Sequence, residues 1–122
     1  MKKAMILFAH GARDPKWAAP FQRLQQIVRA RSPEMGVALA FLELMAPRLP
    51  EAAAALVAEG AEEVTVVPVF LGQGGHVLRD LPALLEELKA THPEVRFKAA
   101  DAVGEDAEVL NAIASYCLDA MR

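Results

Sequence analysis

The sequence predicts an α/β protein with a four-stranded parallel sheet and helices on both faces. Short apolar runs alternate with segments whose apolar residues recur at helical spacing. Strands that alternate with helices form parallel sheets through right-handed crossovers. The 122 residues correspond in length to one domain, residues 1–122, which is large enough to bury about two thirds of its unfolded surface. We therefore expect a single α/β unit that folds without a stabilising disulfide or metal ion.

The first half of the chain supplies two of these strand–helix units. Residues 4–9 form a continuous apolar run, which is typical of a parallel strand buried on both faces. Residues 37–42 are the second strand. Pro50 is placed to open a helix and Gly60 to end it. Two helical stripes accompany these strands: Trp17, Phe21, Leu24 and Val28, then Leu49, Ala53, Leu56 and Val57.

The second half supplies two more units. Residues 64–70 are predicted as the third strand. Pro68 is mildly inconsistent with this assignment, because proline is unfavourable inside a central strand. A glycine-containing loop follows, and Asp80 is predicted to cap a helix with Pro82 in its first turn. Residues 95–99 alternate apolar and polar side chains, which indicates a strand at the sheet edge.

The last helix is predicted from about residue 105 to residue 121. Its apolar stripe would place Val109, Ile113 and Cys117 inward, so we interpret Cys117 as a small core residue. A single cysteine excludes an internal disulfide and fits a reducing compartment.

The bulk composition excludes several function classes. The net charge is −3 and the pI about 5.6, so the composition gives no indication of nucleic-acid binding, which would need a basic face. The N-terminal apolar run is too short for a signal peptide, and no stretch approaches the length of a membrane span. We expect a soluble, cytoplasmic protein.

Three potential ligands appear where apolar strands end. His10, Glu43 and His76 follow the first, second and third strands. With the strand order 2-1-3-4, the carboxyl ends of these strands meet at one edge, and the crevice lies where crossovers leave on opposite faces. Neutral imidazoles suit cobalt, iron, nickel or zinc, and a carboxylate supplies charge or accepts a proton. The pattern therefore indicates metal chemistry.

Each of these residues also has a structural interpretation. His10 could bond a neighbouring carbonyl, and His76 could be a solvated loop residue. Glu43 lies among apolar residues, where a charge is costly unless paired, and Arg48 is its nearest candidate partner. His92 lies at a predicted helix end, where a cation suits the helix dipole, so we treat it as structural.

The flanking residues suggest an anionic ligand. Arg13, Arg48 and Arg79 follow the same strand ends, and together they can receive carboxylates through charge-assisted hydrogen bonds. Gly74 and Gly75 do not have the spacing of a phosphate-binding loop, and we expect them to let the backbone pass close to a flat ligand. These features predict a polyanionic small molecule as the ligand.

Three motifs in order resemble those of a known family. FAHGARDP (8–15), FLELMAPRLPEA (41–52) and VVPVFLGQGGHVLRDLP (66–82) resemble the small, single-unit sirohydrochlorin chelatases of the CbiX type, within the class II chelatases. The resemblance covers most of the chain and weakens after about residue 100. It implies a chelatase-like fold, pairing of two copies as a homodimer, a sirohydrochlorin-type tetrapyrrole as substrate and no permanent cofactor.

The resemblance also implies roles for particular positions. His10 and His76 match the histidines that hold the metal or take pyrrole protons, and Glu43 matches the acidic position that assists them. The divalent metal is itself a substrate, with cobalt the first expectation and ferrous iron or nickel the others, in cobalamin or sirohaem biosynthesis. The family commonly has a hydroxyl residue after His-Gly, whereas this chain has Ala12.

Two other functions are compatible with the residues. A non-catalytic carrier of metal or tetrapyrrole would use the same edge without turnover. A flavodoxin-like signalling or nucleotide-binding domain would share the fold, but the sequence has no phosphate-cradling motif.

Overall fold

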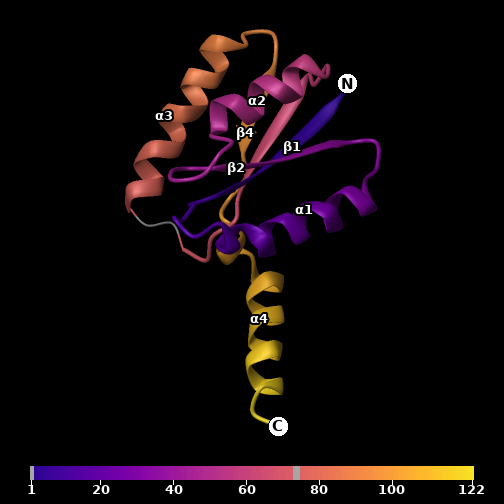
Figure 1. Ribbon diagram of the computed structural model, residues 1–122, viewed down its shortest axis with the longest axis vertical. Coiled ribbons are helices and arrows are strands. Elements are labelled where there is room, and N and C mark those ends of the chain that lie inside the picture. Colours follow the sequence, from indigo (N-terminus) through magenta and orange to yellow (C-terminus); the bar gives the residue numbers. More distant parts are fainter. Residues whose placement is uncertain (1, 73–74) are drawn as a thin grey trace.

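The sheet has four parallel strands in the order β2-β1-β3-β4, as the sequence predicts (Figure 1). The computed structural model describes residues 2–72 and 75–122, with side chains described for 2–72 and 80–122. Both ends of each strand lie within two residues of their predicted positions. The fourth strand, β4, lies at a sheet edge, as predicted. The strands are β1 (Lys3–Ala9), β2 (Gly36–Phe41), β3 (Glu63–Pro68) and β4 (Arg96–Ala99).

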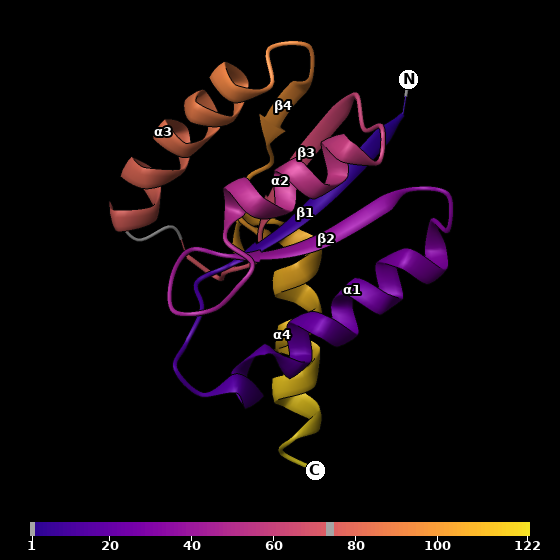
Figure 2. The same ribbon diagram turned by 45° about the horizontal axis from the view of Figure 1, so that its top comes forward.

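Helices cover the sheet on both faces. Right-handed crossovers require α1 to lie on one face and α2 and α3 on the other, because the chain changes direction across the sheet after β2. Figure 2 shows this arrangement. None of the helices in the described ranges is long and apolar enough to cross a membrane. They are η1 (Pro15–Ala18), α1 (Ala19–Arg31), α2 (Leu49–Ala58), α3 (Gly75–Thr91), η2 (Val103–Glu105) and α4 (Ala107–Asp119).

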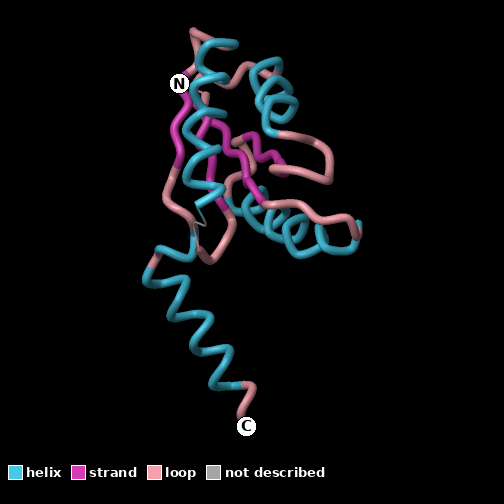
Figure 3. The backbone as a smooth tube through the Cα atoms, turned by 90° about the vertical axis from the view of Figure 1, so that its left-hand side faces the viewer, coloured by secondary structure: helices cyan, strands magenta, loops and turns pink. Residues whose placement is uncertain are grey.

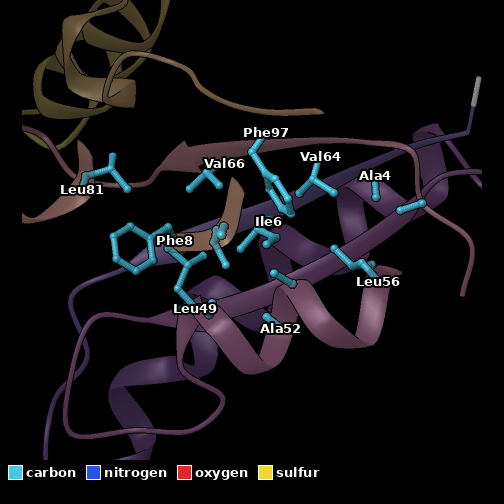
Figure 4. Packing of buried hydrophobic residues seen from close by; sticks show 14 of the residues in the cluster. Ala4, Ile6, Phe8, Leu49, Ala52, Leu56, Val64, Val66, Leu81 and Phe97 are labelled. Atoms are coloured by element: carbon cyan, nitrogen blue, oxygen red, sulfur yellow. The ribbon is translucent and has the colours of Figure 1, made fainter. Parts of the chain in front are cut away.

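The larger part of the core lies between the sheet and helices α2 and α3 (Figure 4). Alternate residues of the strands point to this side, and Ile6, Phe8 and Val66 are fully buried there. The predicted stripe of α2 packs against them through Leu49 and Leu56. Gly60 has φ +98°, a conformation that suits the end of a helix, as predicted.

A second apolar cluster lies on the α1 side. It joins Leu7 and Leu39 of the sheet to the predicted stripe of α1. The side-chain amide of Gln25 and the guanidinium of Arg29 each donate to the Val37 carbonyl oxygen, at 2.9 and 3.0 Å. These two bonds cap part of the outer edge of β2, which has no neighbouring strand.

The predicted start of the third long helix was wrong. Helix α3 begins at Gly75 rather than Asp80, and Pro82 lies inside it rather than in its first turn. An internal proline removes one backbone hydrogen bond. The Pro82 ring is exposed to solvent, so the helix continues through it with no loss of core packing.

The predicted packing of the last helix was also wrong. Helix α4 has nearly the expected bounds, but none of its residues is buried, and Ile113 and Cys117 are exposed. Figures 1 and 3 show α4 projecting away from the rest of the molecule. The segment before it is held to the end of β3, where the Gly104 amide donates to the Phe70 carbonyl oxygen at 3.0 Å. The helix therefore starts beyond the carboxyl ends of the strands and runs outward.

Truncation of Ile6 tests this description of the core. Ile6→Ala removes a fully buried side chain and should lower the free energy of unfolding by about 2–5 kcal/mol. Lys3→Ala, at the exposed start of the same strand, should change it by about 0.5 kcal/mol or less. Urea denaturation followed by circular dichroism measures both, and equal effects would contradict the burial of Ile6.

Candidate functional site

The candidate site is built on the end of β1. The backbone ladder between β1 and β2 continues past both strands: the Leu42 amide donates to the Ala9 carbonyl oxygen at 2.9 Å, and the Glu43 amide to that of His10 at 3.0 Å. His10 and Glu43 are therefore neighbours across two adjacent chain segments. The structure brings these two predicted residues together at the carboxyl edge of the sheet, where open α/β folds bind ligands.

Gly11 makes this close approach possible. Its φ of +97° is in the left-handed region, and a Cβ atom there would lie 1.8 Å from the Glu43 carbonyl oxygen. Only glycine accommodates both constraints without a shift of the backbone. The His-Gly pair of the first motif therefore has a structural basis: the glycine seats the chain that follows His10 against the end of β2.

Phe70 lies on the other side of His10. The Val69 amide donates to the Phe8 carbonyl oxygen at 2.7 Å, so the ladder between β1 and β3 also continues beyond the strands. The Phe70 ring packs against the His10 imidazole, with centroids 4.4 Å apart and planes at 41°. His10 remains exposed whereas Phe70 is buried. The phenyl ring thus limits the orientations of an imidazole that solvent can reach.

Sequence reasoning missed Phe70. The signal was present, because Phe70 ends the apolar run that leads to the same sheet edge as His10. It was treated only as a core residue of the third strand.

The loop between β2 and α2 folds back against the end of β2. The Phe41 amide donates to the Pro47 carbonyl oxygen at 2.9 Å, and Arg48 forms a bridge with Phe41. Leu44, in this turn, has φ 68° and is 57% exposed. Such backbone conformations in non-glycine residues cluster at functional sites. Leu71, just beyond β3, is 62% exposed, so two large apolar side chains face solvent at this edge.

Glu43 is not buried, contrary to what the apolar residues around it suggest. Its side chain is exposed, because the apolar residues around it belong to a turn that places it at the surface. The described ion pairs do not join Glu43 to Arg48, so the salt-bridge interpretation has no support between these two described side chains. Glu43 is accessible to a ligand.

The third motif is described only in part. His76 lies in the first turn of α3 and Arg79 in the second, because the helix begins at Gly75. This contradicts the prediction that His76 and Gly75 lie in a loop. The side chains of His76 and Arg79 and the whole of Gly74 lie outside the described residues. The start of α3 nevertheless follows β3 at the same edge as His10, with α1 and α3 leaving on opposite faces.

The two predicted arginines with described side chains also lie at this edge. Arg13 is exposed between β1 and η1, next to Asp14, whose carboxylate accepts from the Lys16 amide at 2.9 Å. Arg48 precedes the first residue of α2 and lines a cavity of about 430 Å³ together with Asp80. A cavity of about 940 Å³ lies elsewhere, along the outer edge of β2 between α1 and α2. We assign the site to the carboxyl edge because His10 and Glu43 lie there.

The described side chains hold no group of three or more histidine, cysteine, aspartate or glutamate residues that could bind a metal ion. His10 and Glu43 alone form an incomplete ligand set within that part of the chain. Closed structural metal sites commonly use four protein ligands, whereas sites that exchange metal or substrate leave positions open.

An open parallel sheet with accessible polar groups at its switch point defines a doubly wound α/β protein that binds its ligand at the carboxyl edge. Sequence comparison identifies the family. The chain belongs to the CbiX family, whose family model matches residues 4–120.

Curated relatives agree with this assignment. The chain is 33% identical over 90 residues to the sirohydrochlorin cobaltochelatase of Methanocaldococcus jannaschii, in an alignment that covers 74% of this chain and 63% of that protein. The sirohydrochlorin cobaltochelatase of Sulfolobus acidocaldarius is 28% identical over 88% of this chain and 83% of its own length. The chain spans less than two thirds of the length of several such relatives, for example 58% of the Methanococcus aeolicus protein.

Solved structures share the whole fold. A crystal structure described as a cobalamin-biosynthesis CbiX protein from Marinobacter aquaeolei superposes with a TM-score of 0.87 at 31% identity, over 98% of this chain and 97% of that one. The sirohydrochlorin chelatase SirB from Bacillus subtilis subspecies spizizenii, solved with cobalt, gives 0.85 at 27% identity. That alignment covers 98% of this chain but 51% of SirB.

The role of Gly11 can be tested by adding a single methyl group. Gly11→Ala should lower the free energy of unfolding by about 1–3 kcal/mol, because the new Cβ meets the Glu43 carbonyl at a positive φ. The matched control is Gly72→Ala, where a Cβ would have no atom within 4 Å, with an expected change of about 0.5 kcal/mol or less. Chemical denaturation compares them, and a stable Gly11→Ala protein would contradict the close approach.

Proposed function

We propose that this protein is a sirohydrochlorin chelatase. It inserts a divalent metal ion, cobalt first or else ferrous iron or nickel, into sirohydrochlorin or a similar polycarboxylate tetrapyrrole, in cobalamin or sirohaem biosynthesis. The observation that carries the proposal is the backbone pairing of His10 with Glu43 at the carboxyl edge, with both side chains exposed, in a chain that resembles relatives named sirohydrochlorin cobaltochelatases.

Metal insertion requires the macrocycle to lose two pyrrole protons as the ion enters. A residue that accepts protons near neutral pH and also binds divalent metals serves both needs, and histidine does so. In the proposal His10 and His76 present the ion to one face of the ring and take up the pyrrole protons. Glu43, beside His10, orients the imidazole or relays the proton to solvent. An incomplete protein ligand set favours release of the metal to the macrocycle.

The carboxylates of the substrate require cationic partners. Arg13 and Arg48 follow β1 and β2, and Arg79 lies in the second turn of α3. Helices α2 and α3 begin at this edge, and backbone N–H groups at helix N-termini favour anions. In the proposal Gly74 and Gly75, the latter the first residue of α3, let the backbone approach the ring. Leu44 and Leu71 are the exposed apolar side chains that can contact its flat surface.

The remaining parts of the proposal concern partners and location. A flat macrocycle is poorly enclosed by one small sheet edge, since ligand sites bury most of a ligand's surface. We propose that two copies pair as a homodimer so that the second supplies the facing wall. The metal is a substrate, no permanent cofactor is needed, and the protein acts in the cytoplasm.

An insertion assay tests the function. Purified protein is mixed with sirohydrochlorin and cobalt, ferrous iron or nickel in separate reactions, and the absorbance change of the tetrapyrrole is followed after subtraction of the protein-free rate. Multiple turnovers per protein support the chelatase. Stoichiometric binding of metal or tetrapyrrole without turnover would instead indicate the carrier function.

Removal of either imidazole, at position 10 or at position 76, should abolish efficient metal insertion. His10→Ala and His76→Ala should each lower kcat/KM at least about 100-fold, the lower end of the usual contribution of a positioned acid–base group. The matched control is His92→Ala, whose ring packs against Phe97 near the start of β4, with an expected change of less than about twofold. Full activity in the His10→Ala, His76→Ala double variant would refute the assignment, provided circular dichroism shows both proteins folded.

Arg48 should act on binding more than on chemistry. Arg48→Ala should raise KM for the tetrapyrrole about tenfold, the loss expected for one charge-assisted hydrogen bond, while kcat changes little. Arg96→Ala, an exposed arginine at the start of β4 and away from the carboxyl edge, is the control. Initial rates at varied tetrapyrrole concentration separate the two parameters. A loss confined to kcat would contradict a role for Arg48 in binding carboxylates.

A further inference from the structure

The orientation of the His10 imidazole depends on one aromatic neighbour. Among the described residues the imidazole forms no hydrogen bond or ion pair, and the one ring that packs against it is that of Phe70, at a centroid distance of 4.4 Å. Metal-binding histidines usually gain their orientation from a hydrogen bond between the second ring nitrogen and a carboxylate or carbonyl. An exposed side chain without such a contact samples several rotamers. In this chain the Phe70 ring is therefore the described group that restricts the imidazole.

The Phe70 ring is itself fixed by the core. It is 8% exposed, and it packs edge-on against the fully buried Phe8 ring, with centroids 6.2 Å apart and planes at 65°. Phe8 and His10 are two residues apart at the end of β1, where the backbone ladder continues, so their side chains point to the same side of the sheet. The Phe70 ring thus contacts a buried core residue and an exposed imidazole at the same time.

The backbone of Phe70 is held by a segment much later in the chain. The short helix η2 follows β4, and the amide of its central residue, Gly104, donates to the Phe70 carbonyl oxygen at 3.0 Å. Gly104 is buried, and a Cβ atom there would lie 1.6 Å from the Leu71 carbonyl oxygen and 2.4 Å from the Leu71 Cα atom. Backbone therefore packs directly on backbone, which glycine permits because it has no side chain. The position of Phe70 is thus set on both sides, by β1 and by η2.

Phe97 offers a comparison within the same core. It is 6% exposed, it belongs to the same apolar cluster as Phe70, and its ring packs against another histidine, His92, at a centroid distance of 6.0 Å. His92 lies between α3 and β4, at the end of the sheet where the strands begin. The two phenylalanines are therefore matched in type and burial, but Phe70 alone contacts a histidine at the carboxyl edge.

We propose that Phe70 is a positioning residue for His10 in metal insertion. The inference rests on the proposed chelatase function, in which His10 presents the ion and accepts a pyrrole proton. Both tasks require an imidazole nitrogen to point toward the macrocycle, and a displacement of about 1 Å can lower a rate about 100-fold. Phe70 acts through His10 rather than on the tetrapyrrole, because its ring is buried.

Steady-state kinetics of Phe70→Leu tests this role. Leucine keeps an apolar side chain in the core but removes the flat ring. The kcat for cobalt insertion into sirohydrochlorin should therefore fall about tenfold or more, while KM for the tetrapyrrole changes less than about twofold. Phe97→Leu is the matched control and should keep kcat within about twofold of the wild-type value. An unchanged kcat in Phe70→Leu, or an equal loss in both variants, would overturn the proposal.

The folding of the two variants is compared by urea denaturation. Both should unfold at similar urea concentrations, because each loses the ring of a similarly buried phenylalanine. If Phe70→Leu does not fold, Phe70→Met takes its place, because the flexible methionine side chain fills the volume without supplying a flat ring. The same loss of kcat is expected for Phe70→Met, and wild-type kcat in this variant would contradict the positioning role.

The signals of the histidine rings test the contact without any turnover. The chain has three histidines, and the signals that disappear in His10→Ala and in His92→Ala assign two of them in a ¹H–¹³C spectrum. An aromatic ring shifts the signals of a neighbouring group through its ring current. Phe70→Leu should therefore move the His10 signals and leave those of His92 in place, and Phe97→Leu should do the reverse. His10 signals that do not move in Phe70→Leu would refute the contact and the proposal with it.

Binding of cobalt alone separates this proposal from the proposed function. Without tetrapyrrole, the dissociation constant for Co²⁺ should be about tenfold higher in Phe70→Leu than in the wild type, the loss expected when the group that orients a metal-binding histidine is removed. It should be unchanged in Phe97→Leu.

The combined outcomes are distinguishable. Weaker cobalt binding by Phe70→Leu, in a protein whose wild type shows no turnover, would refute the chelatase function and support the positioning of His10. Wild-type turnover with an unaffected Phe70→Leu variant would refute the positioning role alone. A wild-type protein that neither binds cobalt nor inserts it would refute both.

Discussion

The backbone ladder of β1 determines the rest of the site. This strand is paired on both sides: beyond its last residue the His10 carbonyl oxygen still accepts from the Glu43 amide, and on the other side the Phe8 carbonyl oxygen accepts from the Val69 amide, just past the end of β3. His10 is therefore fixed between the ends of two neighbouring strands rather than placed in a free loop. Its carboxylate neighbour and its aromatic neighbour follow from this single constraint, because each comes from a segment that the ladder aligns.

The sequence was sufficient for the sheet and for part of the site. Continuous apolar runs indicate strands that are buried on both faces of a sheet. The preference for right-handed crossovers then limits the possible strand orders. Pro50 and Gly60 correctly predicted the two ends of α2, because proline and glycine influence a helix end through the backbone conformation of their own residue. The convergence of His10 and Glu43 followed from their positions after adjacent strands, and needed no knowledge of side-chain contacts.

The remaining features depended on interactions that no local pattern contains. The start of α3 was missed because Gly75 was interpreted as part of a loop and Pro82 as a first-turn residue, whereas solvent exposure lets Pro82 lie inside the helix. Phe70 was missed because burial and contact with a functional residue have the same sequence signal. The apolar residues around Glu43 predicted burial, but the turn that contains Leu44 exposes the carboxylate.

Helix α4 shows the same limit most clearly. An amphipathic pattern states that one face of a helix will be buried, but it does not state in which molecule. Here the hydrogen bond from the Gly104 amide to the Phe70 carbonyl oxygen holds the start of the helix beside the end of β3, and α4 then runs away from its own sheet (Figures 1 and 3). Its large apolar side chains are therefore exposed within this chain, Tyr116 and Met121 among them. The periodicity was sufficient to predict the helix, whereas the direction of the helix depends on a backbone contact with a segment far earlier in the chain, which no local pattern contains.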